Sequence, residues 1–308
     1  MAVRTKPVSL FVATMSRKHV LRILLMLSAL ITQSCGVFAF AVANNPASIK
    51  LVPASLKQGQ TVAVLVTLPP NTVPPTVTFN KKEYRFFIDE SVSQSAANEG
   101  GQIYRALIAV PADIKPGAYD LKIGDIEKKV TVADGGFGVQ RIRLPKDKDN
   151  FVPSPGEEEA VKKAKMTVSS QQLWQGEFKK PCKARTSTGF GLRRIVNGKL
   201  LTDYFHSGLD FAGGLGAPIY AAQDGKVLLA HAGWKLHGGT VAIDHGDGVI
   251  TFYIHMSKIL AKEGQTVKAG QEIGKVGMTG RANGPHLHFS VYVNGEATNP
   301  QDWFSRVY

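Results

Sequence analysis

Closely spaced glycines divide the second half of the chain, residues 171–308, into short apolar segments. Gly213-Gly214 and Gly238-Gly239 are two of these breaks, and the runs between them are rich in Val, Ile and aromatic residues. Such runs are too short for ordinary helices, whereas glycine allows the tight turns that join short strands. Residues 241–245 and 249–253 flank an Asp-Gly turn signal, as the strands of a hairpin do. We therefore predict an antiparallel β domain over 171–308.

The region 44–134 also has a strand-like pattern. Apolar and polar residues alternate in short runs such as 61–66, 103–108 and 129–132, and Pro, Gly and Asn separate these runs. This spacing predicts a small β-sandwich of immunoglobulin-like type. The region contains no histidine and its acidic residues are scattered. We expect it to be a binding, spacing or regulatory module.

Residues 135–170 differ from both flanking regions, because they combine Gly, Pro and alternating charges. Three glutamates follow Pro155-Gly156, and lysines fill the later turns of the same segment. The helix macrodipole favours this order of charges. We predict a linker with one exposed helix, so that the fold class is all-β with a helical linker.

The first 43 residues resemble a secretory signal peptide. Basic residues at 17, 18 and 22 precede an apolar run over 23–31, and small residues stand at 39, 41 and 43. Thr32-Gln33-Ser34 interrupts the run, which argues against a membrane anchor, and the same residues before Cys35 do not form a lipobox. We predict export across the inner membrane to the periplasm or cell envelope. Cleavage would leave Cys182 as the only thiol, which excludes an intrachain disulfide.

The chain is basic, with a formal net charge of +13. Residues 1–43 carry five basic residues and no acidic residue, so the processed chain would have a charge of +8. Such a surface suits anionic polymers such as cell-wall peptidoglycan, or lipid headgroups, although a merely solvated basic surface is an equal alternative. The sequence contains no aromatic–basic repeat or motif for nucleic acid.

Seven of the eight histidines lie between residues 206 and 288. On a strand, His286 and His288 project from one face, about 7 Å apart at a rise of about 3.3 Å per residue. His206 and Asp210 would lie about 13 Å apart on a straight strand, so we expect the chain to bend between them, at Gly208. Two imidazoles and a carboxylate form the three-ligand set of a catalytic zinc ion, which keeps one position for water.

Seven motifs within about residues 178–304, some two-fifths of the chain, match a known family pattern. They are 187–194 (STGFGLRR), 206–211 (HSGLDF), 216–222 (GAPIYAA), 224–227 (DGKV), 253–257 (YIHMS), 270–274 (GQEIG) and 277–289 (GMTGRANGPHLHF). The region resembles the lysostaphin/LytM-type zinc endopeptidases, which have a duplicated hybrid motif-like β fold and cut peptidoglycan cross-bridges.

The resemblance implies one Zn²⁺ held by His206, Asp210 and His288. It further implies that His286 is the general base and that His255 is its catalytic partner. Family members often have Glu where this chain has Ser290, a position that is not a zinc ligand in the pattern. We expect this difference to affect the substrate groove or the surroundings of the ligands.

Two other functions are considered. A LytM-like domain can be a catalytically inactive activator of a cell-wall amidase, but loss of ligands would mark it and all five family positions are filled here. A lipoyl or biotinyl carrier domain has a sequence pattern like that of residues 264–274, but no Met-Lys modification site is present. The N-terminal β domain could reach the wall, bind a partner or cover the groove, and the sequence does not decide the oligomeric state.

The remaining polar residues of the region are expected to be structural or ambiguous. We predict loop or core positions for His231, His237 and His245, and a structural role for Asp244. Tyr253 lies on the same strand face as His255, where it could assist transition-state charge or pack.

Overall fold

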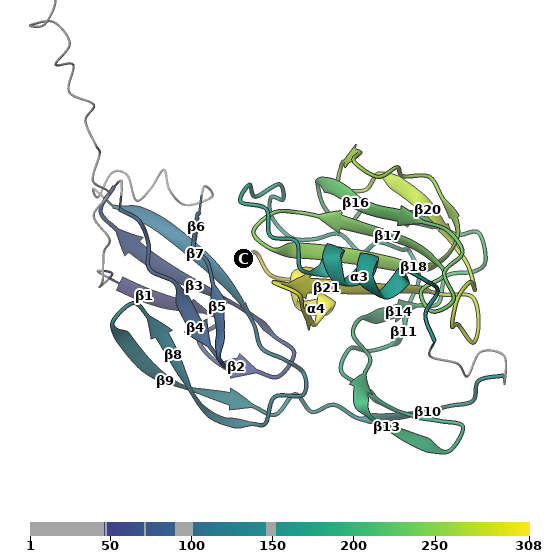
Figure 1. Cartoon of the computed structure of the whole chain (residues 1–308), viewed down its shortest axis with the longest axis horizontal. Helices are drawn as coiled ribbons and strands as arrows, with labels where there is room; N and C mark the ends of the chain where they lie inside the picture. The colour runs from purple at the N-terminus through teal and green to yellow at the C-terminus, as the bar shows by residue number, and fades with distance from the viewer. Residues whose placement is uncertain (1–45, 47, 71, 90–100, 146–151) are drawn as a thin grey trace, which may run out of the picture. The chain divides into compact units, whose positions relative to one another are not determined.

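The computed structural model describes residues 46, 48–70, 72–89, 101–145 and 152–308. All of these belong to one compact unit, Ala41–Tyr308. The predicted all-β class is confirmed, since strands dominate and the described part contains only two helices, α3 and α4 (Figure 1). The predicted signal peptide lies outside the described residues. None of the helices in the described part of the chain has the length and apolarity that a membrane span requires.

Two sheets account for the first β region. One has the order β1-β3-β7-β6 and the other the order β2-β9-β8-β4-β5. Alternating side chains from both sheets share a single hydrophobic core, with Val62, Val64, Phe79, Ile108 and Leu121 among its members. The immunoglobulin-like assignment stays a prediction. The strands are β1 (Ser48–Val52), β2 (Leu56–Lys57), β3 (Thr61–Leu68), β4 (Val77–Phe79), β5 (Lys82–Tyr84), β6 (Phe87–Ile88), β7 (Gln102–Ala109), β8 (Gly117–Ile123) and β9 (Ile126–Ala133).

A ten-stranded sheet forms most of the second β region. Its main path is β11-β14-β21-β18-β17-β16-β19, and every pairing in it is antiparallel. The predicted hairpin is confirmed, because Asp244 pairs with Ile250 across the turn at Gly246–Gly248. The strands are β11 (Thr186–Thr188), β14 (Leu209–Phe211), β15 (Pro218–Tyr220), β16 (Gly225–His231), β17 (Gly239–Asp244), β18 (Val249–Ile259), β19 (Thr266–Val267), β20 (Glu272–Val276), β21 (Leu287–Val293) and β22 (Glu296–Thr298).

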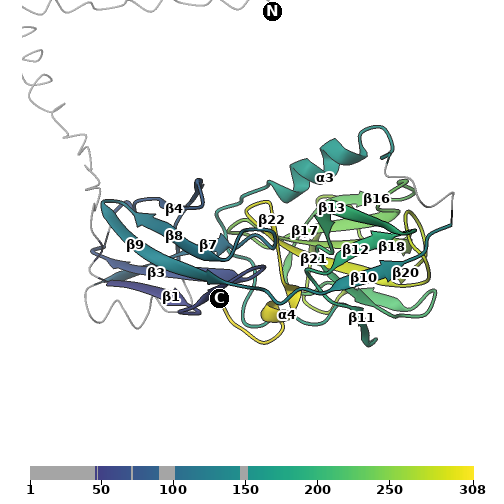
Figure 2. The ribbon, with the colours of Figure 1, turned by 90° about the horizontal axis from the view of Figure 1, so that it is seen from below.

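The segment predicted to be a linker contributes two elements that pack on this region. Strand β10 (Val139–Ile142) pairs in parallel with β12 (Arg193–Val196), which in turn pairs with β13 (Lys199–Phe205). Helix α3 (Glu157–Lys165) has the predicted order of charges, with acidic residues in its first turn and basic residues in its last. Its predicted exposure is wrong on one face, because Glu157, Val161 and Ala164 are buried. Figure 2 shows α3 along the second β region, near β16. The short helix α4 (Pro300–Trp303) follows β22.

A buried histidine makes the stability of this fold sensitive to acid. His245 is fully buried, and its ring nitrogens contact the Asp224 carbonyl and the Thr251 hydroxyl, each within 2.8 Å. Burial lowers the pKa of His245 to about 4, so the ring is neutral in the folded state. In the unfolded chain the pKa of His245 is near 6.5. Between about pH 4 and 6.5 the unfolded state therefore binds more protons than the folded state.

We therefore expect His245 to cost the fold about 2 kcal/mol as the pH falls from 7.5 to 5. Urea unfolding of the full chain at the two pH values, beside His245→Gln, measures this term. The variant should lose less stability than the wild type over the same interval. Equal losses in the two proteins would contradict the assignment.

Candidate metal centre and groove

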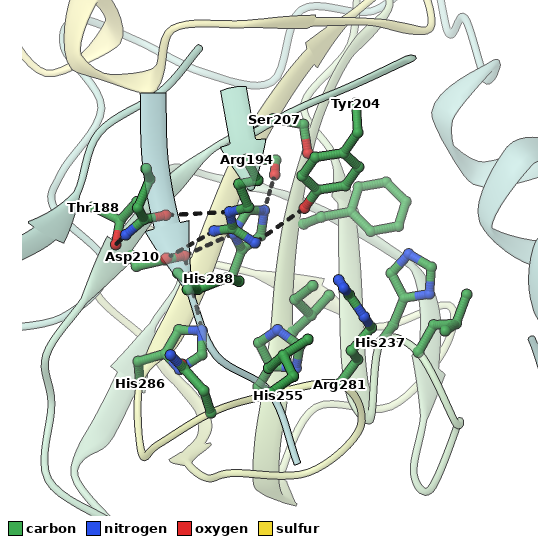
Figure 3. A pocket seen from close by; sticks show the side chains of 18 of the residues that line it. Thr188, Arg194, Tyr204, Ser207, Asp210, His237, His255, Arg281, His286 and His288 are labelled. Atoms are coloured by element: carbon green, nitrogen blue, oxygen red, sulfur yellow. Dashed lines mark hydrogen bonds and ion pairs between the residues drawn. The ribbon is translucent and has the colours of Figure 1, made fainter. Parts of the chain in front are cut away.

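A groove of about 270 Å³ lies over one face of the central strands β18 and β21. Three of the four histidines that the resemblance singles out, His255, His286 and His288, line the groove together with Asp210 (Figure 3). The fourth, His206, is fully buried. No described residue before Gln140 lines this groove, and the linker strand β10 supplies part of its wall.

Pairing of strands brings the three predicted ligands together. Asp210 on β14 lies directly opposite His288 on β21, and directly paired residues have Cβ atoms about 4.5–5.5 Å apart. His206 follows the end of β13 and precedes β14. The carboxylate oxygen Oδ1 of Asp210 lies 2.8 Å from His206 Nε2 and 2.8 Å from His288 Nδ1. The two ring nitrogens lie 2.9 Å from each other.

The outer atoms of the same side chains have partners of their own. His206 Nδ1 donates to the carbonyl oxygen of Gly189 at 2.6 Å, which leaves Nε2 with its lone pair toward the cluster. His288 Nε2 lies 2.8 Å from the Ser290 hydroxyl, so a proton on Nε2 leaves Nδ1 free for the cluster in the same way. Arg194 approaches the second carboxylate oxygen of Asp210 at 3.5 Å. Such partners orient ligands around a metal.

The electrostatics of the cluster suit a divalent cation. Burial raises the pKa of Asp210, but the close contacts of its carboxylate with the His206 and His288 rings outweigh burial and hold the pKa well below its usual range. Burial lowers the pKa of His288 to about 4. The carboxylate is therefore ionised and the imidazole neutral at neutral pH, the forms that bind metal. These three residues are the cluster of convergent metal-ligand atoms found in the described part of the chain, and the donor set fits Zn²⁺.

Gly208 is required for a different reason from the one predicted. Its φ is not in the left-handed region that favours glycine, so the bend does not depend on glycine's conformational freedom. Instead, a Cβ atom at this position would overlap the carbonyl oxygen of Phe289 and lie 2.9 Å from His288 Nε2. Glycine permits close approach of the chain to the strand that carries His288.

We expect Gly208→Ala to lower the free energy of unfolding by about 1–3 kcal/mol, because backbone must move to admit the methyl group. Zinc affinity should fall as well, since the methyl group would press on His288. Gly214→Ala is the matched control, because no atom lies within 4 Å of a Cβ there. Urea unfolding and zinc titration compare the two variants, and equal behaviour would contradict the role of close packing.

Two further histidines face the cluster from the groove. The ring centroids of His255 and His286 lie 4.8 Å apart. His286 Nδ1 donates to the Gly284 carbonyl at 2.8 Å, and its Nε2 lies 3.8 Å from Asp210 Oδ1. The Nδ1 atom of His255 donates to the Thr279 carbonyl at 2.9 Å. In both rings Nε2 is therefore the nitrogen that can accept a proton.

Burial, followed by the neighbouring His286 and His288, lowers the pKa of His255 well below its usual range. A neutral His255 whose Nδ1 proton is held by Thr279 cannot donate from Nε2. Donation of a hydrogen bond from His255 to an oxyanion is thus disfavoured, and orientation of the general base or of water is favoured.

The remaining candidates separate clearly. His245 is a core residue, and Tyr253 is fully buried with its hydroxyl bonded to the Ala222 amide and Thr251, so Tyr253 packs. The exposed ring of His231 stacks on Trp234. His237, in contrast, lines the groove, and the sequence analysis missed this position. Arg194 and Gln140 also line the groove. Arg194 could have been noticed in the sequence, because it is a second arginine directly after the Phe-Gly-Leu-Arg motif.

A three-ligand His-Asp-His cluster at a groove in a β domain defines a metal-dependent hydrolase centre. The sequence model of peptidase family M23 matches residues 204–300, which include this centre. The chain contains a domain of peptidase family M23.

Curated relatives agree with this assignment over the same region. The peptidoglycan DD-endopeptidase ShyA of Vibrio cholerae is 42% identical over 119 residues, 38% of this chain and 27% of ShyA. The DD-carboxypeptidase/endopeptidase Mpg of Neisseria meningitidis is 41% identical over 117 residues, 38% of this chain and 26% of Mpg. The match thus spans about a quarter of the length of each of these relatives.

A solved structure extends the likeness beyond the catalytic region. A putative M23 peptidase from Pseudomonas aeruginosa aligns with 79% of this chain and 94% of its own, at a TM-score of 0.56 and 28% identity. The shared architecture therefore includes most of the described residues.

Proposed function

We propose that this chain is an exported zinc metalloendopeptidase that hydrolyses peptide cross-links of bacterial peptidoglycan. The observation that carries the proposal is the convergence of His206 Nε2, Asp210 Oδ1 and His288 Nδ1 within 2.9 Å of one another, in one groove with His255 and His286. The names of the relatives support the substrate class, because ShyA is named a peptidoglycan DD-endopeptidase and Mpg a DD-carboxypeptidase/endopeptidase.

The residues have distinct tasks in this proposal. His206, Asp210 and His288 would hold one zinc ion. When bound, this ion would act as a Lewis acid that polarises a carbonyl group and lowers the pKa of water. His286 takes the proton of the attacking water at Nε2, since its Nδ1 is already engaged with Gly284. His255, neutral and fixed by Thr279, accepts a hydrogen bond that orients the water. No covalent intermediate with the protein is needed.

Cleavage of cross-links in purified sacculi by the full chain tests the proposal. We expect new amino and carboxyl termini and a loss of cross-linked stem peptides in directly cross-linked sacculi, less cleavage in glycine-bridged sacculi, and none after a zinc chelator. Added zinc should restore cleavage. Failure of the zinc-loaded protein to cleave cross-links in either wall would contradict the proposal and favour the amidase-activator alternative, which an assay with added amidase can test.

Export is proposed on the composition of residues 1–43. A signal peptidase would remove them, and the protein recovered from the cell envelope should begin near residue 42 or 44. Amino-terminal sequencing measures this, and recovery of the uncut chain in the cytoplasm would contradict it.

A further inference from the structure

A glutamate that no family motif includes is completely buried at the start of α3. Glu157 has no exposed surface, although glutamate is seldom fully buried. Its carboxylate accepts hydrogen bonds from the Ser154 amide at 2.7 Å, the Leu236 amide at 3.1 Å and the His237 amide at 2.8 Å. It also accepts one from His237 Nδ1 at 2.7 Å. Four donors thus satisfy a buried charge, which requires a well-defined geometry.

Three of these donors belong to one loop. Residues 232–238 connect β16 with β17, and Trp234 and Gly238 close the loop through reciprocal backbone hydrogen bonds of 3.1 and 3.3 Å. Leu236 and His237 of this loop line the groove, and Figure 3 shows His237 there. A helix from the segment between the two β regions therefore holds a wall of the groove.

The same loop holds the backbone of His255. The carbonyl oxygen of His237 accepts a hydrogen bond from the His255 amide at 2.9 Å. His255 has φ of 66°, in the left-handed region, and lies where the register between β17 and β18 shifts. A non-glycine residue in this conformation persists only where its surroundings hold it, and such residues concentrate at active sites.

We infer that Glu157 is a positioning residue for His255, acting through the loop that carries His237. The carboxylate fixes the His237 amide and ring, and the His237 carbonyl then fixes the His255 amide at its strained position. The Thr279 carbonyl holds the other end of His255, at its ring. The catalytic assignment of His255 in this inference rests on the proposed function.

The test compares Glu157→Ala and Glu157→Gln with Glu158→Gln in the full, zinc-loaded chain. Glu158 is the exposed neighbour on the same helix and is the matched control. Turnover of a directly cross-linked muropeptide dimer should fall about 100-fold in kcat for Glu157→Ala, the loss typical of a 1 Å misplacement. Glu157→Gln keeps one acceptor oxygen and should lose about 10-fold. KM should change little, and zinc affinity should be unchanged because no metal ligand contacts Glu157.

Amide hydrogen exchange supplies a readout that does not depend on activity. In both Glu157 variants the His255 amide should exchange at least about 10-fold faster, while the amide of Ile250, farther along β18, keeps its protection. Glu158→Gln should match the wild type in both assays.

Two results would overturn the inference. One is normal exchange at His255 in both Glu157 variants; the other is a lowered melting temperature with unchanged kcat for the folded protein, which would show a purely structural role. If the wild type itself cleaves no muropeptide, the proposed function fails, and the exchange result alone then decides whether Glu157 positions His255.

Discussion

Replacing His288 with alanine is expected to abolish both zinc binding and hydrolysis. The substitution removes one of three predicted ligand atoms, which lie within 2.9 Å of one another beside the Asp210 carboxylate. A bound metal ion would supply several kcal/mol of transition-state stabilisation. At 1.36 kcal/mol per factor of ten, the rate of cross-link cleavage should fall at least about 1000-fold.

Metal analysis and a sacculus assay on the same preparation measure the two losses together. His231→Ala is the matched control, because His231 is an exposed histidine that does not line the groove. It should retain zinc and most of the activity. A zinc-free but active His288→Ala protein would rule out metal catalysis at this site.

Replacing His286 with alanine is expected to separate catalysis from metal binding. His286 is not a predicted ligand, and its Nε2 lies 3.8 Å from Asp210 Oδ1, within the groove but outside the cluster of three. General base catalysis contributes about 100- to 10,000-fold. We expect kcat to fall within that range, while zinc content and affinity stay at the wild-type level.

The muropeptide dimer assay gives kcat, and chelator competition gives the zinc affinity. Loss of zinc together with activity would show that His286 is a ligand instead of a base. Wild-type kcat in this variant would move the role of base to His255, the other groove histidine whose Nε2 can accept a proton.

The sequence predicted well those features that depend on local pattern. Alternation and glycine breaks indicated the strands, and the turn at Gly246–Gly248 indicated the hairpin. The family motifs pointed to His206, Asp210 and His288, and the structure brings these three side chains together. The boundaries of the domains, the signal peptide and the roles assigned to individual histidines stay predictions.

The structure corrected expectations wherever contacts between distant residues mattered. Gly208 was expected to permit a bend, but the close approach of Phe289, 81 positions later, is what excludes a side chain. Tyr253 was expected either to assist transition-state charge or to pack in the core. Its hydroxyl accepts a hydrogen bond from the Ala222 amide, which favours packing. Ser290 was expected to affect the groove or the surroundings of the ligands, and the structure specifies how: its hydroxyl lies 2.8 Å from His288 Nε2, where it can hold the proton away from the cluster.

By itself, the sequence determined that this chain forms β structure, because strand periodicity is a property of neighbouring residues. The ligand set of His206, Asp210 and His288 was predicted from the resemblance of its motifs to a known family. Only the tertiary structure decided that the segment before residue 171 helps to build the groove. Strand β10 joins β12 across some 50 residues, and Glu157 meets His237 across 80. Such pairings depend on burial and hydrogen bonding between segments whose separation leaves no periodic trace in the sequence.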